Sequence, residues 1–248
     1  MSSIAAAQIT STIIDAKRRE RIFYTGMAMA IIITVFAGFS RTWFLRPYFP
    51  QPQALVPVVI LHGVVFSSWI VLFITQTSLV AAKRTRTHMR LGIAGGVLAC
   101  LMIIIGVVTA IIRAKGPSPI PGINALSFLT IPLGDLSVFA ILIGSAFYYR
   151  RRLDFHKRLM LLGTIGLLPA AVARLPFGFI EQGGPFVFYG LGDLFIIPCL
   201  IFDLVSRGRP HRVTMLATVL IVLTQPLRLM IGGTHAWLVF ATWLTHWT

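Results

Sequence analysis

The sequence predicts an all-α protein, a polytopic membrane bundle of seven transmembrane helices, and three observations support this. Of the 248 residues, 56% are hydrophobic and only 12% are charged, whereas soluble domains carry about 25% charged residues. Seven apolar stretches are each long enough for a membrane span, which needs about 20 residues. Basic residues gather in alternate connections between these stretches. A soluble core of this size could not hide so much apolar surface, so the expected solvent is lipid.

The seven stretches cover approximately 22–40, 55–81, 90–113, 124–149, 157–180, 185–205 and 212–231. Prolines break the chain between the first two stretches and between the third and fourth, and Gly183-Gly184-Pro185 breaks it before the sixth. Residues 1–21 are predicted to be a cytoplasmic segment, with a short interfacial helix over 1–16. The membrane domain is expected over 22–231, and residues 232–248 are expected to form an outer interfacial helix with an aromatic face.

The positively charged residues predict the orientation. Of the 22 Lys and Arg residues, sixteen lie before the first stretch or in the loops after the second, fourth and sixth, and four lie in the other loops. Cytoplasmic loops carry such an excess. The N-terminus is therefore predicted to be cytoplasmic and the C-terminus outside. The short basic clusters are expected to contact anionic lipid headgroups, and nucleic-acid binding is not expected.

The last four stretches resemble two copies of one helical hairpin. Gly134-Asp135, His156 and Arg174-Leu175 in the first copy recur as Gly192-Asp193, His211 and Arg228-Leu229 in the second. The second and third stretches are a candidate third copy that lacks the outward arginine. Tandem repeats of this kind are a known membrane construction. The alternative is chance similarity among apolar helices joined by basic turns.

Five polar side chains are predicted to lie within the spans: His62, Asp135, Arg174, Asp193 and Arg228. Each charge at the bilayer centre costs roughly 2.5–3.5 kcal/mol, so the two carboxylates are expected to pair with the two guanidiniums. Helical side chains lean toward the N-terminus of their helix, which brings both sets together in the outer half of the membrane. The first hypothesis is therefore a membrane protein, such as a transporter, that binds or passes a small ligand, solute or proton at this layer.

Internal prolines support a polar cavity at the same depth. Each of the last four stretches contains one: Pro132, Pro169, Pro198 and Pro226. A proline removes a backbone hydrogen bond, and the freed carbonyl needs a partner in protein or water. The structural alternative is a pair of Asp–Arg locks in a scaffold or assembly protein without a ligand. Enzymatic activity is not favoured, because dinucleotide, Walker and serine-hydrolase motifs are absent from the sequence. The sequence is compatible with assembly into a homo-oligomer and does not decide the oligomeric state.

The histidines support a second, redox hypothesis that involves haem or quinone. His88, His156 and His211 open three outward-running stretches at one level, and histidines on different helices at similar depth can hold haem. His62 is a further candidate ligand. Their basic neighbours and their positions at helix N-termini weigh against haem. No close spacing of His, Cys or carboxylate residues predicts a zinc or copper site.

Two further features are explained by ordinary packing of side chains. Trp69 and Gln76 share a helical face and could contact a quinone, but core packing is favoured. Cys100 and Cys199 each lie inside an apolar run, and no disulfide between them is expected.

Several short motifs extend over nearly the whole chain. They are Phe23-Tyr24-Thr25-Gly26-Met27-Ala28, His62-Gly63, His88-Met89-Arg90-Leu91-Gly92 and His156-Lys157-Arg158-Leu159-Met160. In combination they resemble a family of seven-helix proteins of the bacterial inner membrane whose function is not known. The resemblance implies a multi-pass location in that membrane and brings no reaction or ligand.

The predicted orientation can be tested with fusions to the C-terminus. Alkaline phosphatase folds only outside the cytoplasm and is expected to be active, while green fluorescent protein at the same position is expected to stay dark. The opposite pattern would contradict the orientation derived from the basic loops.

Overall fold

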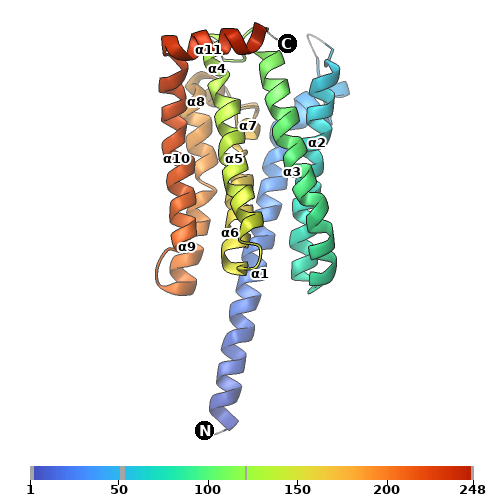
Figure 1. Ribbon diagram of the computed structural model, residues 1–248. Coiled ribbons are helices and arrows are strands. Elements are labelled where there is room, and N and C mark those ends of the chain that lie inside the picture. Colours follow the sequence, from blue (N-terminus) through green and yellow to red (C-terminus); the bar gives the residue numbers. More distant parts are fainter. Residues whose placement is uncertain (1–2, 51–53, 121, 247–248) are drawn as a thin grey trace.

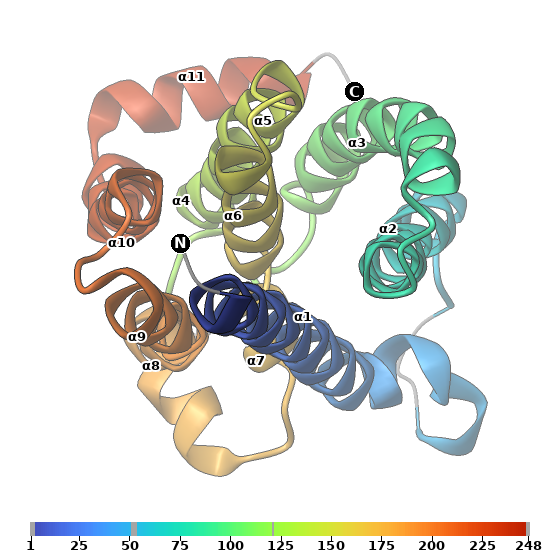
Figure 2. The same cartoon turned by 90° about the horizontal axis from the view of Figure 1, so that it is seen from below.

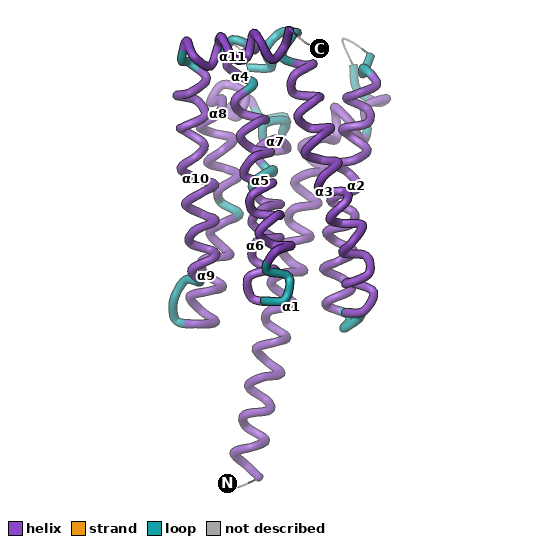
Figure 3. Tube along the Cα trace, viewed as in Figure 1, coloured by secondary structure: helices purple, strands orange, loops and turns teal. Residues whose placement is uncertain are grey.

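The computed structural model describes residues 3–50, 54–120 and 122–246, with residues 3–14 described by their backbone alone. Within these ranges the chain is helical and has no strand (Figure 3). The helices are α1 (Ser3–Phe39), α2 (Pro57–Ala81), α3 (Thr85–Arg113), α4 (Ala125–Phe128), α5 (Thr130–Tyr148), α6 (Leu153–Ile165), α7 (Pro169–Val172), α8 (Gly178–Asp193), α9 (Ile196–Arg207), α10 (Arg212–Gly232) and α11 (His235–His246). After α1 follow a π-helical turn, η1 (Ser40–Phe44), and a 3₁₀ turn, η2 (Arg46–Tyr48).

Six helical segments are long and apolar enough to cross a membrane. They are Asp15–Phe44, Pro57–Ala81, Thr85–Arg113, Ala125–Tyr148, Gly178–Arg207 and Arg212–Gly232. The structure is therefore a helical bundle of the kind expected for a multi-pass membrane protein.

The stretch 157–180, predicted as a further span, does not form one continuous helix. Helix α6 ends at Ile165, a turn follows, and α7 contains only Pro169–Val172. Pro169 has no amide hydrogen, and its ring would clash with the carbonyl four residues earlier, so α6 cannot continue through it unbroken. Figure 1 shows α6 and α7 following one another upward through the bundle from the lower turn after α5.

The bundle has α5 and α6 at its centre. The antiparallel hairpin of α2 and α3 packs against α5 on one side, and α10 packs against both α5 and α6 on another. Helix α1 crosses obliquely and contacts α2 and α7 (Figure 2). Helix α11 lies across the upper end, against α3, α4 and α10 (Figure 1).

Three of the four internal prolines coincide with interruptions. Besides Pro169, Pro132 lies in the first turn of α5 just after the short α4, and Pro198 lies in the first turn of α9 after the break at Leu194 and Phe195. Helix α10, by contrast, runs through Pro226. The breaker predicted before the sixth stretch is present as a kink in α8, where Gly184 has φ 57° and precedes Pro185.

The short helix predicted at the N-terminal end of the chain is wrong, and the helix predicted at the C-terminal end agrees with the structure. No short separate helix lies within the described part of 1–16, because α1 is continuous from Ser3 to Phe39 and extends beyond the lower end of the bundle (Figure 1). No proline interrupts that segment. At the other end, α11 occupies the residues predicted to form a C-terminal helix, and the indole of Trp237 donates to the carbonyl of Leu126 at 2.8 Å.

Trp69 belongs to the core, as favoured from the sequence. It is 2% exposed and packs edge-on against Phe139, with ring centroids 5.2 Å apart. Its indole nitrogen donates to the Thr164 hydroxyl at 3.3 Å and so joins α2 to α6. The side-chain oxygen of Gln76, by contrast, is buried without a hydrogen-bond partner among the described residues.

The contact between α1 and α7 depends on a glycine. A Cβ atom at Gly38 would collide with the carbonyl of Ala171, whereas a Cβ at Gly26 would meet nothing within 4 Å. Gly38→Ala is therefore expected to destabilise the protein by about 1–3 kcal/mol, the usual cost of overpacking. Gly26→Ala is the matched control and is expected to be neutral or slightly stabilising, since alanine favours helix. Thermal unfolding of both variants in detergent tests this, and equal midpoints would contradict it.

Candidate functional site

Asp135 on α5 and Arg228 on α10 form a buried ion pair, in which Nη1 of Arg228 donates to Oδ1 of Asp135. The hydroxyl of Tyr189 on α8 accepts from the same Nη1 at 3.0 Å and lies 3.4 Å from Oδ1 of Asp135. Gly134 makes the approach possible, because a Cβ atom there would collide with the Arg228 side chain. Three helices therefore meet at one guanidinium.

Two more hydrogen bonds extend this group. Nη2 of Arg228 donates to the Thr224 hydroxyl at 2.9 Å, and the amide of Gln225 donates to Oδ1 of Asp193 at 2.9 Å. The Asp193 side chain is half-buried and stands at the last residue of α8, directly before the break. We call these residues the outer polar cluster: Asp135, Tyr189, Asp193, Thr224, Gln225 and Arg228.

The cluster differs from the predicted layer of two carboxylates and two guanidiniums. Arg174 does not pair with a carboxylate in the described part of the chain; it donates to the carbonyl of Ala170 and lies over the Phe39 ring, 4.9 Å from its centroid. His62 stacks on Phe66 with centroids 4.0 Å apart, and its Nδ1 is buried without a partner among the described residues. The expected pairing of Arg174 is wrong because the break before α7 directs its chain toward α1.

A second group of buried charges lies nearer the lower end of the bundle, and the sequence analysis did not single it out. Arg158 on α6 donates from Nε to Oδ1 of Asp203 on α9 at 3.0 Å, and also from Nη2. The hydroxyl of Thr214 and the backbone N–H of His211, at 3.2 Å, donate to Oδ2 of the same carboxylate. We call Arg158, Asp203, His211 and Thr214 the inner polar cluster. The sequence feature that could have revealed this cluster is the charge of Asp203 inside the apolar stretch 185–205.

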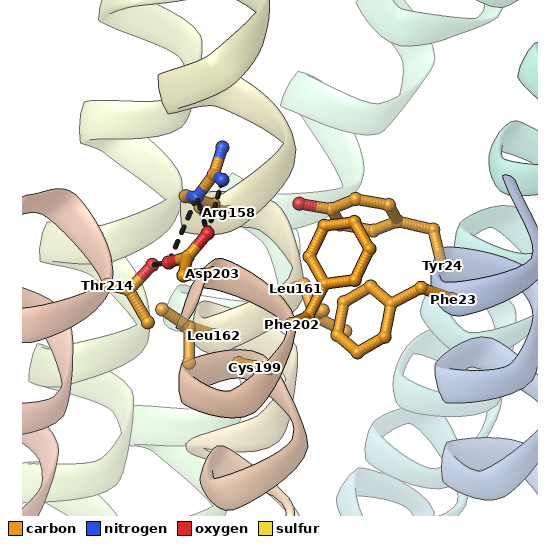
Figure 4. A pocket seen from close by; sticks show the side chains of 9 residues that line it. All are labelled: Phe23, Tyr24, Arg158, Leu161, Leu162, Cys199, Phe202, Asp203 and Thr214. Atoms are coloured by element: carbon orange, nitrogen blue, oxygen red, sulfur yellow. Dashed lines mark hydrogen bonds and ion pairs between the residues drawn. The ribbon is translucent and has the colours of Figure 1, made fainter. Parts of the chain in front are cut away.

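A small cavity adjoins the inner polar cluster (Figure 4). Its volume of about 10 Å³ holds about one water molecule. Phe23 and Phe202 stack beside it with centroids 4.2 Å apart, and the Tyr24 ring directs its hydroxyl toward Arg158 (Figure 4). The cavity therefore joins α1 to the charges on α6 and α9.

His211 is the N-cap of α10. Its Nδ1 accepts from the backbone N–H of Val213 at 3.1 Å, and its Nε2 lies 3.2 Å from Oδ2 of Asp154. Because Nδ1 accepts, the proton of the neutral ring sits on Nε2 and is donated to Asp154. Burial lowers the pKa of His211, and the charge of Arg158 lowers it further. This histidine is thus a buried structural cap.

Two other histidines near the lower end of the bundle lie together. The rings of His88 and His156 meet edge to face with centroids 6.3 Å apart. Nδ1 of His156 is 2.9 Å from the carbonyl of Ala146, while Nδ1 of His88 is buried without a partner among the described residues. Across the ranges that the structure describes, no group of three or more His, Cys, Asp or Glu side chains could hold a metal ion.

Comparison with known proteins does not assign the chain to a family. No protein-family model, curated protein or solved structure shows significant similarity to the chain.

The inner polar cluster predicts a stability effect. Asp203→Ala leaves the guanidinium of Arg158 buried without its carboxylate, and loss of one partner of a buried pair costs about 3–5 kcal/mol. The matched control is Glu20→Gln, because Glu20 pairs with Lys157 at a partly exposed position where an ion pair contributes about 0–1 kcal/mol. Denaturation in detergent is expected to show a much lower midpoint for Asp203→Ala alone; equal midpoints would contradict the buried role of Asp203.

His211 also predicts a pH dependence. Because its pKa is lowered in the folded protein, the unfolded chain takes up a proton first, at its ordinary value of about 6.5. The stabilising contribution is therefore complete above that pH and is lost as the pH falls through and below it. His211→Asn retains an N-cap without the titration. Between pH values of about 7.5 and 5.5, the wild type is expected to lose more thermal stability than His211→Asn; parallel curves would refute this assignment.

Proposed function

We propose that this chain is a multi-pass membrane protein that binds and passes protons at the outer polar cluster. The observation that carries the proposal is the charge count of the cluster. Among the described residues, Asp135 takes the guanidinium of Arg228, and the hydrogen-bond partner of the Asp193 carboxylate is the neutral amide of Gln225. With both carboxylates ionised, the cluster carries one negative charge more than its single arginine balances.

A proton on Asp193 removes that imbalance. An ionised carboxylate at membrane depth costs roughly 2.5–3.5 kcal/mol, and a protonated one accepts and donates hydrogen bonds without the charge. Gln225 fits both states, since its amide offers a donor and an acceptor. Asp193 is half-buried whereas Asp135 is buried, so Asp193 is the carboxylate that exchanges protons more readily. The two carboxylates titrate as a coupled unit.

The cluster also differs from a fully satisfied structural lock. Nε of Arg228 is buried and has no hydrogen-bond partner among the described residues. Polar atoms in purely structural networks are nearly always paired, because an unpaired one costs about 1–3 kcal/mol. An unpaired donor beside two carboxylates supports a site whose hydrogen bonds change during function.

The break in the helix after Asp193 supports a mechanism in which the junction between α8 and α9 moves. Helix α8 ends at Asp193 and α9 begins at Ile196. Ile196, Cys199, Ala217 and Ile221 form an apolar layer between the outer and inner polar clusters. Protons cannot cross such a layer while it is dry, so passage requires the α8–α9 junction to move and admit water.

The finer topology belongs to the same proposal. It has seven crossings in the bacterial inner membrane, a cytoplasmic N-terminus with basic loops on anionic lipid, and tandem hairpins made by α5–α7 and α8–α10. The upward course of α6 and α7 and the opposite ends reached by α1 and α11 support it (Figure 1). The two hairpins differ in detail, because the break falls on the outward arm in the first and on the inward arm in the second.

A redox function with haem or quinone is the second candidate, favoured by the contact between His88 and His156. Nδ1 of His156 is held by a carbonyl, which leaves Nε2 available as a ligand. The rings now touch each other, so a haem between them would have to part α3 from α6. Visible spectra of the oxidised and dithionite-reduced protein test this: a sharp reduced α-band identifies a cytochrome, and a colourless protein excludes bound haem.

Proton passage is tested in liposomes that contain the purified protein and a pH-sensitive dye. With a potassium gradient and valinomycin as the driving force, the wild type is expected to conduct protons and Asp193→Asn to lose most of the flux. Asp193→Asn should keep its unfolding temperature, because the asparagine carbonyl still accepts from Gln225. The control is Asp15→Asn, an exposed carboxylate near the start of the membrane segment of α1.

Asp135→Asn tests the structural contribution of the ion pair with Arg228, and Asp193→Asn tests proton passage. Asp135→Asn leaves Arg228 without its carboxylate and is expected to reduce folding yield, by analogy with the cost of about 3–5 kcal/mol for breaking a buried pair. If Asp193→Asn folds normally and conducts like the wild type, or if the wild type conducts no protons, the proposal is wrong and a scaffold role is favoured.

A further inference from the structure

Among the residues that the structure describes, Arg174 is a cation without an anionic partner. Its recorded contacts are a hydrogen bond from Nη1 to the carbonyl of Ala170 and the face of the Phe39 ring. The ion pairs of the described residues all involve other cations. The side chain is nevertheless exposed at the surface of the protein. A ligand can therefore reach the guanidinium from outside the bundle.

Snorkelling does not explain this position. A snorkelling arginine extends its head toward the headgroup region and keeps its stem in the apolar layer. The backbone N–H of Arg174 bonds to the carbonyl of Ala171 at 3.1 Å, and the guanidinium turns back to the carbonyl of Ala170. Because α6 and α7 run upward (Figure 1), this direction leads away from the nearer end of the bundle. The charge is thus held back from the upper end of the bundle by its bond to the Ala170 carbonyl.

The guanidinium of Arg174 has donors left over. Its hydrogen bond among the described residues runs from Nη1 to the carbonyl of Ala170, whereas a guanidinium carries five N–H donors. The remaining donors are suited to anionic oxygen atoms.

The flanking surface is apolar and aromatic. Phe36, one turn before Phe39 on α1, stacks on Phe44 of η1, and Phe177, three residues after Arg174, stacks on Phe179. All four rings of these two stacks are exposed on the protein surface. Exposed apolar side chains of this kind contact acyl chains in a bilayer. A cation bordered by such rings matches an amphiphile and not a small soluble anion.

From this charge and surface complementarity we propose that Arg174 is a binding site for the phosphate of an anionic phospholipid in the outer half of the membrane. The phosphate oxygens accept from the free nitrogens of the guanidinium, where Arg forms bidentate bonds, and the acyl chains lie against the flanking rings. The site is separate from the outer polar cluster, and the proposal does not depend on proton passage.

The test compares lipid retention by full-length variants. Wild type, Arg174→Gln and Arg113→Gln are delipidated in detergent, given phosphatidylglycerol, and examined by native mass spectrometry. Arg113 ends α3 at the same end of the bundle and is exposed, so its variant matches the charge loss while the basic loops stay unchanged. Arg174→Gln is expected to retain one lipid fewer than the wild type, and Arg113→Gln the same number as the wild type. Equal retention by all three overturns the proposal.

Two further arms identify the ligand. Phosphatidylcholine, oleate and inorganic phosphate are each tested for an Arg174-dependent rise in unfolding temperature. A rise with phosphatidylglycerol alone supports the proposal; a rise with free phosphate or oleate but not with phosphatidylglycerol overturns the phospholipid assignment. If Arg174→Gln fails to fold, Arg174→Lys keeps the charge but loses the bidentate fork and is expected to retain the lipid less well than Arg113→Lys does. Equal retention by these two lysine variants overturns the proposal.

Discussion

The ion pair between Asp135 and Arg228 organises the upper half of this bundle as drawn in Figure 1. It joins α5 to α10 and draws Tyr189 from α8 onto the same guanidinium. In lipid each unpaired charge is costly, so the pair sets where these helices can approach each other. It also occupies the one arginine of the cluster, and Asp193 is left with a neutral amide. The unbalanced carboxylate on which the proposed proton binding rests is a direct consequence of this pair.

The inner polar cluster has a different character. Asp203 accepts from Arg158, Thr214 and the backbone of His211, and His211 in turn caps α10 and contacts Asp154. Nearly every polar atom of this group has a partner, which is typical of a structural network. The outer polar cluster keeps an unpaired donor and a carboxylate without a cation. The same residue types thus stabilise one level of the bundle and leave another level open to change.

Several helices of the bundle are interrupted. Prolines coincide with the interruptions before α5, α7 and α9; Asp193 adjoins the one before α9, and Arg174 lies in the turn after α7. A broken helix leaves backbone carbonyls without their helical donors, and one such carbonyl, that of Ala170, is satisfied by Arg174 itself. The two arginines that correspond in the predicted repeat therefore act differently. Arg228 lies on a continuous helix and pairs with a carboxylate, while Arg174 follows a break and meets an aromatic ring and the membrane.

The sequence by itself determined the helical class, most of the long apolar segments, the kink at Gly184 and the polar residues within the spans. These depend on local composition, on hydropathy over about 20 residues and on proline and glycine chemistry. Only the tertiary structure decided which charges meet. Asp135 and Arg228 are 93 positions apart, and Arg158 and Asp203 are 45 apart. Hydropathy gives the depth of a side chain but not the direction in which its helix turns it. The break before α7 separated Arg174 from the carboxylates, and no local pattern specifies how such a break redirects the chain.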